Sequence, residues 1–340
     1  MRNKRVLVTG ATGHIGNVLV RKLLQRGAHV RALILPGEDT ISLADLDVEF
    51  VEGDVLDLPR LLEVFEGMEI VYHLAGVISI LPGDDPFVWR VNVEGTRNVL
   101  AAARRAGVKR LVYTSSIHAL KRVPHGTVID ESVPFDPDNP YGVYDRSKAV
   151  ASLEVLRAAQ EGLDAVIVCP TGVIGPYDYR RSEMGEVIRG ALRNTPQLYV
   201  NGAYDFVDVR DVAEGLILAA ERGRRGESYI LSGQRISVRY LLETVREITG
   251  LRFPTVRIPT SLARFLTRFT PAYYRWTGKT PRFTPYSLEV LESNSLISHA
   301  KATRELGYRP RALFESLSDT VRWFLEAGRM ITHRAIPSPR

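Results

Sequence analysis

Short runs of β-branched and aliphatic residues alternate with longer amphipathic stretches through the first two-thirds of the chain. The apolar runs predict strands at residues 5–8, 30–35, 48–51, 70–74, 110–113 and 165–169. The amphipathic stretches predict helices over residues 15–25, 58–65, 87–106 and 144–160. Because strands and helices alternate, we expect βαβ units and a parallel sheet that helices cover on both faces.

The alternation weakens after Pro176, where glycine and proline become frequent. The stretches DFVDVRDVAEGLILAAE and ESYILSG still predict a helix and a strand that return to the sheet. The remainder is mostly helical in pattern and is interrupted by prolines. We therefore expect a doubly wound α/β domain formed by residues 1–175 with 206–233, a smaller helical substrate lobe formed by 176–205 and 234–328, and a flexible tail over 329–340.

Composition and charge narrow the class of protein. The 340 residues carry a formal net charge of +6, and the basic residues are scattered, which makes an anionic cofactor a better candidate partner than nucleic acid. No apolar run approaches the roughly 20 residues of a membrane span, and the start MRNKRVLVTG lacks the apolar core of a signal peptide. The single cysteine, Cys169, excludes an internal disulfide and a cysteine-rich metal site. These features predict a cytoplasmic protein without a bound metal.

The segment VLVTGATGHIG places Gly10, Gly13 and Gly16 between the first expected strand and the first expected helix. Glycine there permits a tight turn, close approach of the backbone to a pyrophosphate, and close packing of the helix on the sheet. The helix N-terminus adds free N–H groups and a partial positive charge. In this context the pattern predicts a Rossmann-type dinucleotide site rather than a turn without a ligand.

The segment NPYGVYDRSKA holds Tyr144 four residues before Lys148, so that a helix projects both from one face. Moving a hydride to or from a carbon–oxygen bond requires a proton on that oxygen, and a phenol can supply it once its pKa falls below about 10. A nearby ammonium and an oxidised nicotinamide would stabilise the phenolate. We therefore predict Tyr144 as general acid/base, with Lys148 tuning it and binding the nicotinamide ribose. Tyr141 either lines the substrate pocket or packs.

Further motifs follow in order: GDVLD at 53–57, HLAG at 73–76, NVEGT at 92–96, YTSS at 113–116, CPTGVIGP at 169–176, FVDVRDVA at 206–213 and KATRELGYRP at 301–310. This ordered set spans nearly the whole chain and resembles the extended short-chain dehydrogenases/reductases of the NAD-dependent epimerase/dehydratase family. The resemblance implies NAD(P) as cofactor and Ser116, with Ser115 as the alternative, as the hydroxyl that bonds the substrate oxygen. It implies cofactor contacts from Gly10, Thr12, Gly13, His14, Ile15, Gly16, Asp54, Val55, Leu74, Ala75, Gly76, Asn92, Thr114, Tyr144, Lys148, Pro170, Thr171 and Val173.

The choice between NAD and NADP depends on the residue at the end of the second strand, where NAD enzymes carry an acid. That position is about Leu35, which is neither acidic nor basic. Glu38 and Asp39 follow in the loop, where they either bind a ribose hydroxyl or repel a 2′-phosphate, and Arg31 lies within the strand. The sequence leaves both cofactors open.

Two departures from the family pattern bear on the reaction. The 4,6-dehydratases carry Thr and an acidic pair after the active serine, where this chain has Ile117 and His118. The UDP-sugar epimerases commonly carry Phe-Asn where it has Pro170 and Thr171. The chain more closely resembles dihydroflavonol-reductase and 3β-hydroxysteroid-dehydrogenase-like members, which implies hydride transfer at an alcohol or ketone carbon. A nucleotide-sugar epimerase and a non-catalytic NADP-binding regulator are the alternatives, and the retained Tyr–Lys pair favours an enzyme.

Three further expectations concern the surroundings of the site. His118 and His125 are expected as solvated loop side chains, with a second acid/base as the alternative, and His73 as a core residue. The stretch 259–291 mixes aromatic and basic residues, which is typical of an amphipathic lobe or of a lid over an apolar substrate, with membrane-surface contact less favoured. By analogy with relatives, residues 92–106 and 144–160 predict a homodimer formed through a four-helix bundle.

Overall fold

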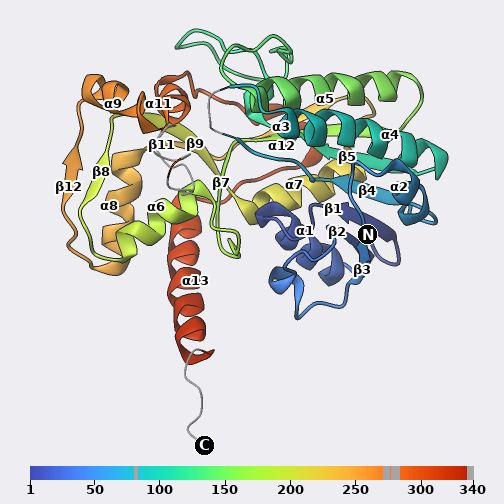
Figure 1. The fold of residues 1–340 in the computed structure, drawn as a ribbon, viewed down its shortest axis with the longest axis horizontal. Helices are drawn as coiled ribbons and strands as arrows, with labels where there is room; N and C mark the ends of the chain where they lie inside the picture. The colour runs from blue at the N-terminus through green and yellow to red at the C-terminus, as the bar shows by residue number, and fades with distance from the viewer. Residues whose placement is uncertain (80–82, 271–275, 277–283, 335–340) are drawn as a thin grey trace, which may run out of the picture.

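A seven-stranded sheet forms the centre of the protein in this computed structural model, which describes residues 1–79, 83–270, 276 and 284–334 (Figure 1). Its strand order is β10-β6-β5-β4-β1-β2-β3, and every neighbouring pair is parallel. The strands are β1 (Arg5–Thr9), β2 (His29–Ile34), β3 (Glu49–Glu52), β4 (Ile70–His73), β5 (Arg110–Thr114), β6 (Ala165–Pro170) and β10 (Ser228–Leu231). The predicted doubly wound fold is confirmed, and the bounds of the first six strands differ from the prediction by about one residue at either end.

Helices cover both faces of this sheet because its strand residues alternate between two cores. Val6 and Val8 of β1 belong to the core under α1 (His14–Gln25) and α7 (Val209–Arg222). Leu7 belongs to the core under α2 (Leu58–Val64), α4 (Gly95–Arg105) and α5 (Val143–Gln160). The strands are thereby fixed so that their carboxyl ends form one edge, at which ligands bind in open α/β sheets.

The long helix expected over residues 87–106 is interrupted. It consists of α3 (Pro86–Trp89), a π-helical turn at Arg90–Glu94, and α4. The π turn inserts an extra residue into the helix, a feature that is frequent at functional sites. Here it includes Asn92, whose side chain reaches the loop after β4. Hydrophobic periodicity does not report such a local insertion.

The second lobe contains small sheets as well as helices. One sheet is β11-β9-β7, formed by Gln234–Ser237, Ala203–Asp208 and Gly172–Ile174; the other pairs β8 (Gln197–Tyr199) with β12 (Thr255–Arg257). The helices are α6 (Glu183–Leu192), α8 (Val238–Thr249), α9 (Thr260–Thr267), α11 (Pro285–Glu292) and α13 (Leu313–Arg334). Figure 1 shows this lobe beside the carboxyl edge of the large sheet.

Two segments near the C-terminus differ from the expected organisation. Helix α12 (Ala300–Leu306), which lies within the range predicted for the substrate lobe, packs against α7 and β10 of the large sheet. Helix α13 continues to Arg334, so residues 329–334 of the predicted flexible tail are helical, while 335–340 lie outside the described residues.

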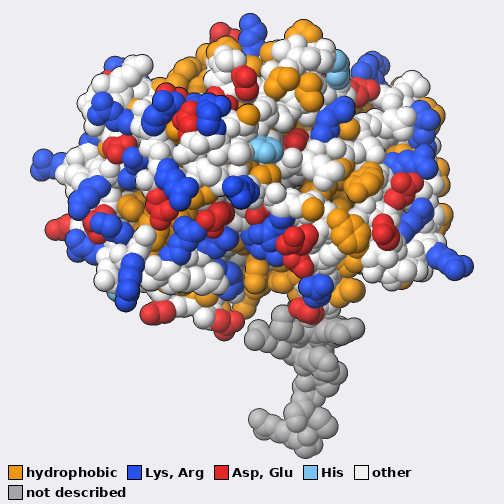
Figure 2. Space-filling model, turned by 180° about the vertical axis from the view of Figure 1, so that it is seen from behind, with side chains coloured by type: hydrophobic (Ala, Val, Ile, Leu, Met, Phe, Trp, Pro, Cys, Tyr) orange, Lys and Arg blue, Asp and Glu red, His pale blue; other side chains and the backbone are white. Residues whose placement is uncertain are grey.

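The surface supports the view that charge is dispersed. On the face drawn in Figure 2, Lys and Arg side chains are interspersed with Asp and Glu rather than gathered into one basic patch. Within the described residues, no helix has both the length and the apolar character that a bilayer crossing requires.

Candidate active site

The glycine turn after β1 leaves no room for a side chain at Gly10 or at Gly16. Gly10 has φ of +69°, and a Cβ there would lie 2.7 Å from the backbone nitrogen of Ala75. A Cβ on Gly16 would lie 2.1 Å from the carbonyl oxygen of Gly10. Gly13 is the N-cap of α1 and provides no side-chain hydrogen bond to the first turn. The close turn and the uncapped helix N-terminus fit the pyrophosphate of a dinucleotide.

The other residues of this turn contact the segment after β7. The imidazole Nε2 of His14 lies 3.0 Å from the carbonyl oxygen of Pro176, and Ile15 packs at the edge of the core. Beside the turn, Leu74 hydrogen-bonds through its N–H to the carbonyl of Thr9 at 3.1 Å. The turn, the loop after β4 and the segment after β7 therefore meet at one point of the sheet edge.

Glu38 lies in the loop after β2, the region in which the sequence left the cofactor choice undecided. Its carboxylate accepts hydrogen bonds from the Leu35 N–H at 2.8 Å and from the Thr12 hydroxyl at 2.6 Å. Arg180 forms an ion pair with the same carboxylate. Arg31 points elsewhere, to the carbonyl of Val64 at 2.8 Å. An acid therefore lies directly beside the glycine turn, three residues later than the position expected from the sequence.

Ser116, Tyr144 and Lys148 come together from β5 and α5. Ser116 follows β5, and its Oγ accepts from the His118 N–H at 3.2 Å. Its side chain also acts to lower the pKa of Tyr144, against the larger effect of burial. All three side chains are buried, with 7%, 9% and 5% of their surface exposed. Ser115 instead lies 2.6 Å from the hydroxyl of Ser152, so Ser116 is the serine that meets the phenol.

Lys148 makes different contacts from those that we expected. Its Nζ donates to the Thr114 carbonyl at 2.6 Å and to the Tyr113 hydroxyl at 3.2 Å. Burial lowers the pKa of Lys148 to about 8. Burial also raises the pKa of Tyr144 to about 12, with the Ser116 hydrogen bond acting in the opposite direction. The predicted lowering of the phenol pKa is therefore wrong for the protein alone, because the ammonium is directed at the end of β5.

Asn92 joins the loop after β4 to α5 by hydrogen bonds. Its Oδ1 accepts from the Val77 N–H at 2.8 Å, and its Nδ2 donates to the Val77 carbonyl at 3.0 Å and to the Ser147 hydroxyl at 2.9 Å. A Cβ at Gly76 would lie 3.0 Å from Asn92 Oδ1 and 3.7 Å from Lys148 Nζ. Asn92 thus holds the loop after β4 against α5, beside the lysine.

Other predicted cofactor residues line the same sheet edge. Thr114 Oγ1 is buried and has no hydrogen-bond partner among the described residues, which fits a contact to a bound group. Asp54 accepts from the Leu56 N–H at 2.9 Å after β3, and Val55 is buried against α4. Pro170 ends β6, and Val173 lies in β7.

Asp205 is a buried residue of this region that the sequence reasoning missed. It accepts from the Thr171 hydroxyl at 2.6 Å and from the Gly233 N–H at 2.9 Å. Burial raises the pKa of Asp205 to about 6. The motif FVDVRDVA gave no sign of it, because Asp205 directly precedes the quoted stretch.

The expectation for His118 is wrong, whereas that for His73 is confirmed. His118 Nε2 lies 2.9 Å from the Tyr204 hydroxyl, and the two rings stack at 5.8 Å between centroids. Burial lowers the pKa of His118 to about 3, so the imidazole is neutral near pH 7 and is a poor proton donor. His73 is buried between the hydroxyls of Thr9 and Thr96.

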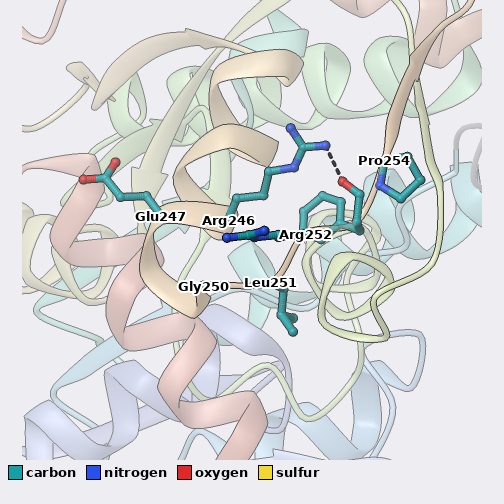
Figure 3. A pocket seen from close by; sticks show the side chains of 7 residues that line it. Arg246, Glu247, Gly250, Leu251, Arg252 and Pro254 are labelled. Atoms are coloured by element: carbon teal, nitrogen blue, oxygen red, sulfur yellow. Dashed lines mark hydrogen bonds between the residues drawn. The ribbon is translucent and has the colours of Figure 1, made fainter.

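Two hollows lie outside this group. The one in Figure 3 is at the C-terminal end of α8 in the substrate lobe, where Arg246 donates to the Phe253 carbonyl and Glu247 points away. The other borders the loop after Ser116 and is lined by Ile117, His118, Arg122, Tyr204 and Asn294 among others. Only the second adjoins the catalytic group. Among the described residues, no three His, Cys, Asp or Glu side chains come together as a metal site.

Comparison with known proteins places this geometry in a family. The model of the NAD dependent epimerase/dehydratase family matches residues 6–232. The chain is 39% identical over 324 residues to "Sterol demethylase protein B" of Methylococcus capsulatus, covering 95% of this chain and 98% of that protein. It is 31% identical to a 3 beta-hydroxysteroid dehydrogenase/Delta 5-->4-isomerase of Mycobacterium tuberculosis, covering 90% and 86%.

A solved structure described as a nucleoside-diphosphate-sugar epimerase from Pseudomonas aeruginosa is also similar. It superposes with a TM-score of 0.78 at 26% identity and covers 96% of this chain and 98% of its own. With the glycine turn and the Ser–Tyr–Lys group in place, the chain belongs to the NAD-dependent epimerase/dehydratase family of extended short-chain dehydrogenases/reductases, a family of NAD(P)-dependent enzymes.

Proposed function

We propose that this enzyme transfers a hydride between nicotinamide and an alcohol or ketone carbon of an apolar substrate, with Tyr144 as general acid/base. The observation that carries the proposal is that Ser116, Tyr144 and Lys148 are all buried at the carboxyl edge of the sheet, with Tyr144 and Lys148 one turn apart on α5. Bound nicotinamide would donate or accept the hydride. The phenol would hold or release the proton at the substrate oxygen, and Ser116 would orient that oxygen.

Lys148 contributes in two ways. Its ammonium is buried against two neutral acceptors, with no carboxylate at ion-pair distance among the described residues. When the cofactor is bound, this positive charge would stabilise the nicotinamide ribose and the developing phenolate. Thr114, whose hydroxyl has no hydrogen-bond partner among the residues that the structure describes, lies at the same strand end.

Tyr144→Phe tests the assignment because it keeps the ring and removes the proton. With a 3β-hydroxysteroid and NAD⁺ as the first probe pair, we expect turnover to fall by about 10²–10⁴-fold with the affinity for NAD⁺ unchanged. A cofactor Kd measured by fluorescence separates a chemical effect from a folding defect. Undiminished turnover in the variant contradicts the assigned role.

The surroundings of Glu38 favour NAD over NADP. Its carboxylate is held at the end of β2 by Leu35 and Thr12, where an acid binds the ribose 2′-hydroxyl and repels a 2′-phosphate. Arg180 balances part of that charge. Glu38→Gln should therefore bring the Kd values for NAD and NADP closer together, and Arg180→Ala should move them further apart. If Glu38→Gln instead moved the two Kd values apart and Arg180→Ala brought them together, Arg180 and not Glu38 would determine the choice between NAD and NADP.

An apolar substrate is supported by the substrate lobe. Helix α9 exposes Leu262, Phe265 and Leu266, and Phe269 follows it. Arg264, on the same helix, is paired with Glu292 of α11, so part of the basic character is neutralised. The aromatic and basic residues of the predicted lid at 271–275 and 277–283 lie outside the described residues. A nucleotide-sugar epimerase remains the alternative, and release of tightly held NAD on denaturation, with no net turnover of alcohols, would favour it.

We also propose that two copies associate through α4 and α5. The two helices pack side by side and are joined by the ion pairs Arg97–Glu154 and Arg104–Glu161. Leu153 of α5 is 40% exposed on this surface, where a four-helix arrangement would bury it. Leu153→Glu should convert a dimer into a monomer in light scattering at micromolar concentration. A monomeric wild-type protein removes the proposal.

A further inference from the structure

The first turn of α5, which carries Tyr144, receives little support from its own sequence. Gly142 is the N-cap and makes no side-chain hydrogen bond to the helix. Tyr144 is the second residue of the helix, where backbone N–H groups have no intrahelical partner. The general acid/base therefore sits on a turn that other parts of the protein must hold in place.

Tyr286, at the start of α11 in the substrate lobe, contacts this first turn through its hydroxyl and its ring. Its hydroxyl donates to Asp145 Oδ1 at 2.7 Å, and Asp145, the residue after Tyr144, is fully buried. The ring of Tyr286 lies over Gly142, where a Cβ would meet it at 3.8 Å. Asp145 in turn lies in the first turn, where a carboxylate interacts favourably with the helix N-terminus.

The N-terminus of α11 is stabilised by its own sequence, so Tyr286 occupies a well-defined position relative to the first turn of α5. Thr284 and Ser287 form a capping box around the N-terminus of α11, with the Thr284 N–H donating to the Ser287 hydroxyl at 2.8 Å. Tyr286 lies inside that capped turn. Because Tyr286 lies in a capped helix turn and not in a loop, its hydrogen bond restrains Asp145 relative to α11.

A second contact runs in parallel with the first. Glu289 follows Tyr286 by three residues on α11, and its carboxylate lies 3.5 Å from Arg122 Nη1. The Arg122 guanidinium lies 3.6 Å from the centroid of the Tyr141 ring and 3.9 Å from Asp145 Oδ2. We call Tyr286, Asp145, Arg122 and Glu289 the clasp, since they join α11 to the start of α5.

We propose that the clasp positions Tyr144, so that docking of the substrate lobe and alignment of the general acid/base are one event. Tyr286 and Asp145 are then positioning residues that act through the first turn of α5. The inference rests on the proposed role of Tyr144. It assigns the substrate lobe a part in catalysis besides the binding of substrate.

The test compares Tyr286→Phe and Asp145→Ala with a conservative variant, Asp145→Asn, and with a control expected to be silent, Tyr240→Phe. Asp145→Asn keeps a carboxamide oxygen that accepts from Tyr286 but removes the negative charge that faces Arg122. Tyr240→Phe removes the same hydroxyl from an exposed tyrosine of α8. With a 3β-hydroxysteroid and NAD⁺, Tyr286→Phe and Asp145→Ala should lower kcat about tenfold, the effect of losing a hydrogen bond to a charged acceptor. The Kd for NAD⁺ should not change, and Asp145→Asn should lose less of kcat than Asp145→Ala.

A second measurement does not depend on turnover. In the NAD⁺-bound protein, amide hydrogen exchange in residues 143–148 should be faster in Tyr286→Phe and Asp145→Ala than in Asp145→Asn and Tyr240→Phe. If the wild type turns over no alcohol but exchange follows this order, the proposed function fails and the clasp stands. If Tyr286→Phe matches Tyr240→Phe in both measurements, or Asp145→Asn is impaired as much as Asp145→Ala, the clasp is overturned.

Discussion

Replacing Lys148 by methionine tests the view that the site holds a buried positive charge without a counter-charge. Lys148 is 5% exposed and donates to the Thr114 carbonyl and the Tyr113 hydroxyl. Burial lowers its pKa from 10.5 to about 8. Because a tenfold change in proton affinity corresponds to about 1.4 kcal/mol, the charged form costs the fold about 3 kcal/mol at pH 7.

The sign follows from proton binding. Between pH 8 and 10.5 the unfolded chain holds a proton on Lys148 more often than the folded chain does. The free energy of unfolding of the wild type therefore rises through this window by about 3 kcal/mol from this residue alone. Methionine does not titrate, so the variant lacks this contribution to the pH dependence of stability. It also removes two hydrogen bonds, at about 1 kcal/mol each, but this loss is the same at every pH.

The assay is urea unfolding of wild type and Lys148→Met at pH 7 and at about pH 10.5. Other titrating groups are common to both proteins, so they cancel in the difference. We expect the stability of the variant relative to wild type to fall by about 3 kcal/mol across the window. Lys121→Met, at an exposed lysine, is the matched control and should give a constant difference. A constant difference for Lys148→Met as well would refute the reasoning, because the ammonium would then have a compensating partner.

Three further predictions concern the scaffold of the site. Gly10→Ala and Gly37→Ala both place a side chain at positive φ, but only position 10 is crowded, so in thermal unfolding Gly10→Ala should cost about 1–3 kcal/mol more. Burial raises the pKa of Asp145 to about 6, so in urea titrations the stability of the wild type relative to Asp145→Asn should fall as pH rises from about 4 to 6. Asp205→Ala leaves the Thr171 hydroxyl and a backbone N–H unpaired and should lower the free energy of unfolding by about 2–5 kcal/mol.

The sequence was sufficient to predict those parts of the site that lie within one helix or at one strand–helix junction. The glycine turn lies between β1 and α1, and its residues are selected by local backbone geometry. Tyr144 and Lys148 lie on one helix, so their spacing alone predicts that they share a face. Ser116 lies two residues after the end of β5, and parallel strands present their carboxyl ends at a common edge.

The remaining features depend on contacts between elements that periodicity does not encode. Tyr286 and Asp145 are separated by 141 positions, and no pattern in either segment indicates that they meet. His118 looks like a loop residue until the Tyr204 ring covers it. Glu38 reaches the glycine turn because the chain folds back after Leu35, and its carboxylate accepts from Leu35 and Thr12 three residues beyond the usual position of the acid. Each case was decided by tertiary packing.

The separation of Asp145 from Lys148 follows the same logic. The two residues lie three apart on α5, a spacing at which opposite charges pair readily on a helix. Instead Lys148 turns toward β5 and Asp145 toward α11, so burial lowers the pKa of one and raises the pKa of the other. A direct pair would relieve both costs, but it would neutralise the ammonium beside Tyr144 and release Tyr286. The fold thus keeps Lys148 without a carboxylate partner among the described residues, while Asp145 lies 3.9 Å from Arg122 and accepts from Tyr286. This separation of the two charges is what the proposed cofactor role of Lys148 and the proposed clasp both require.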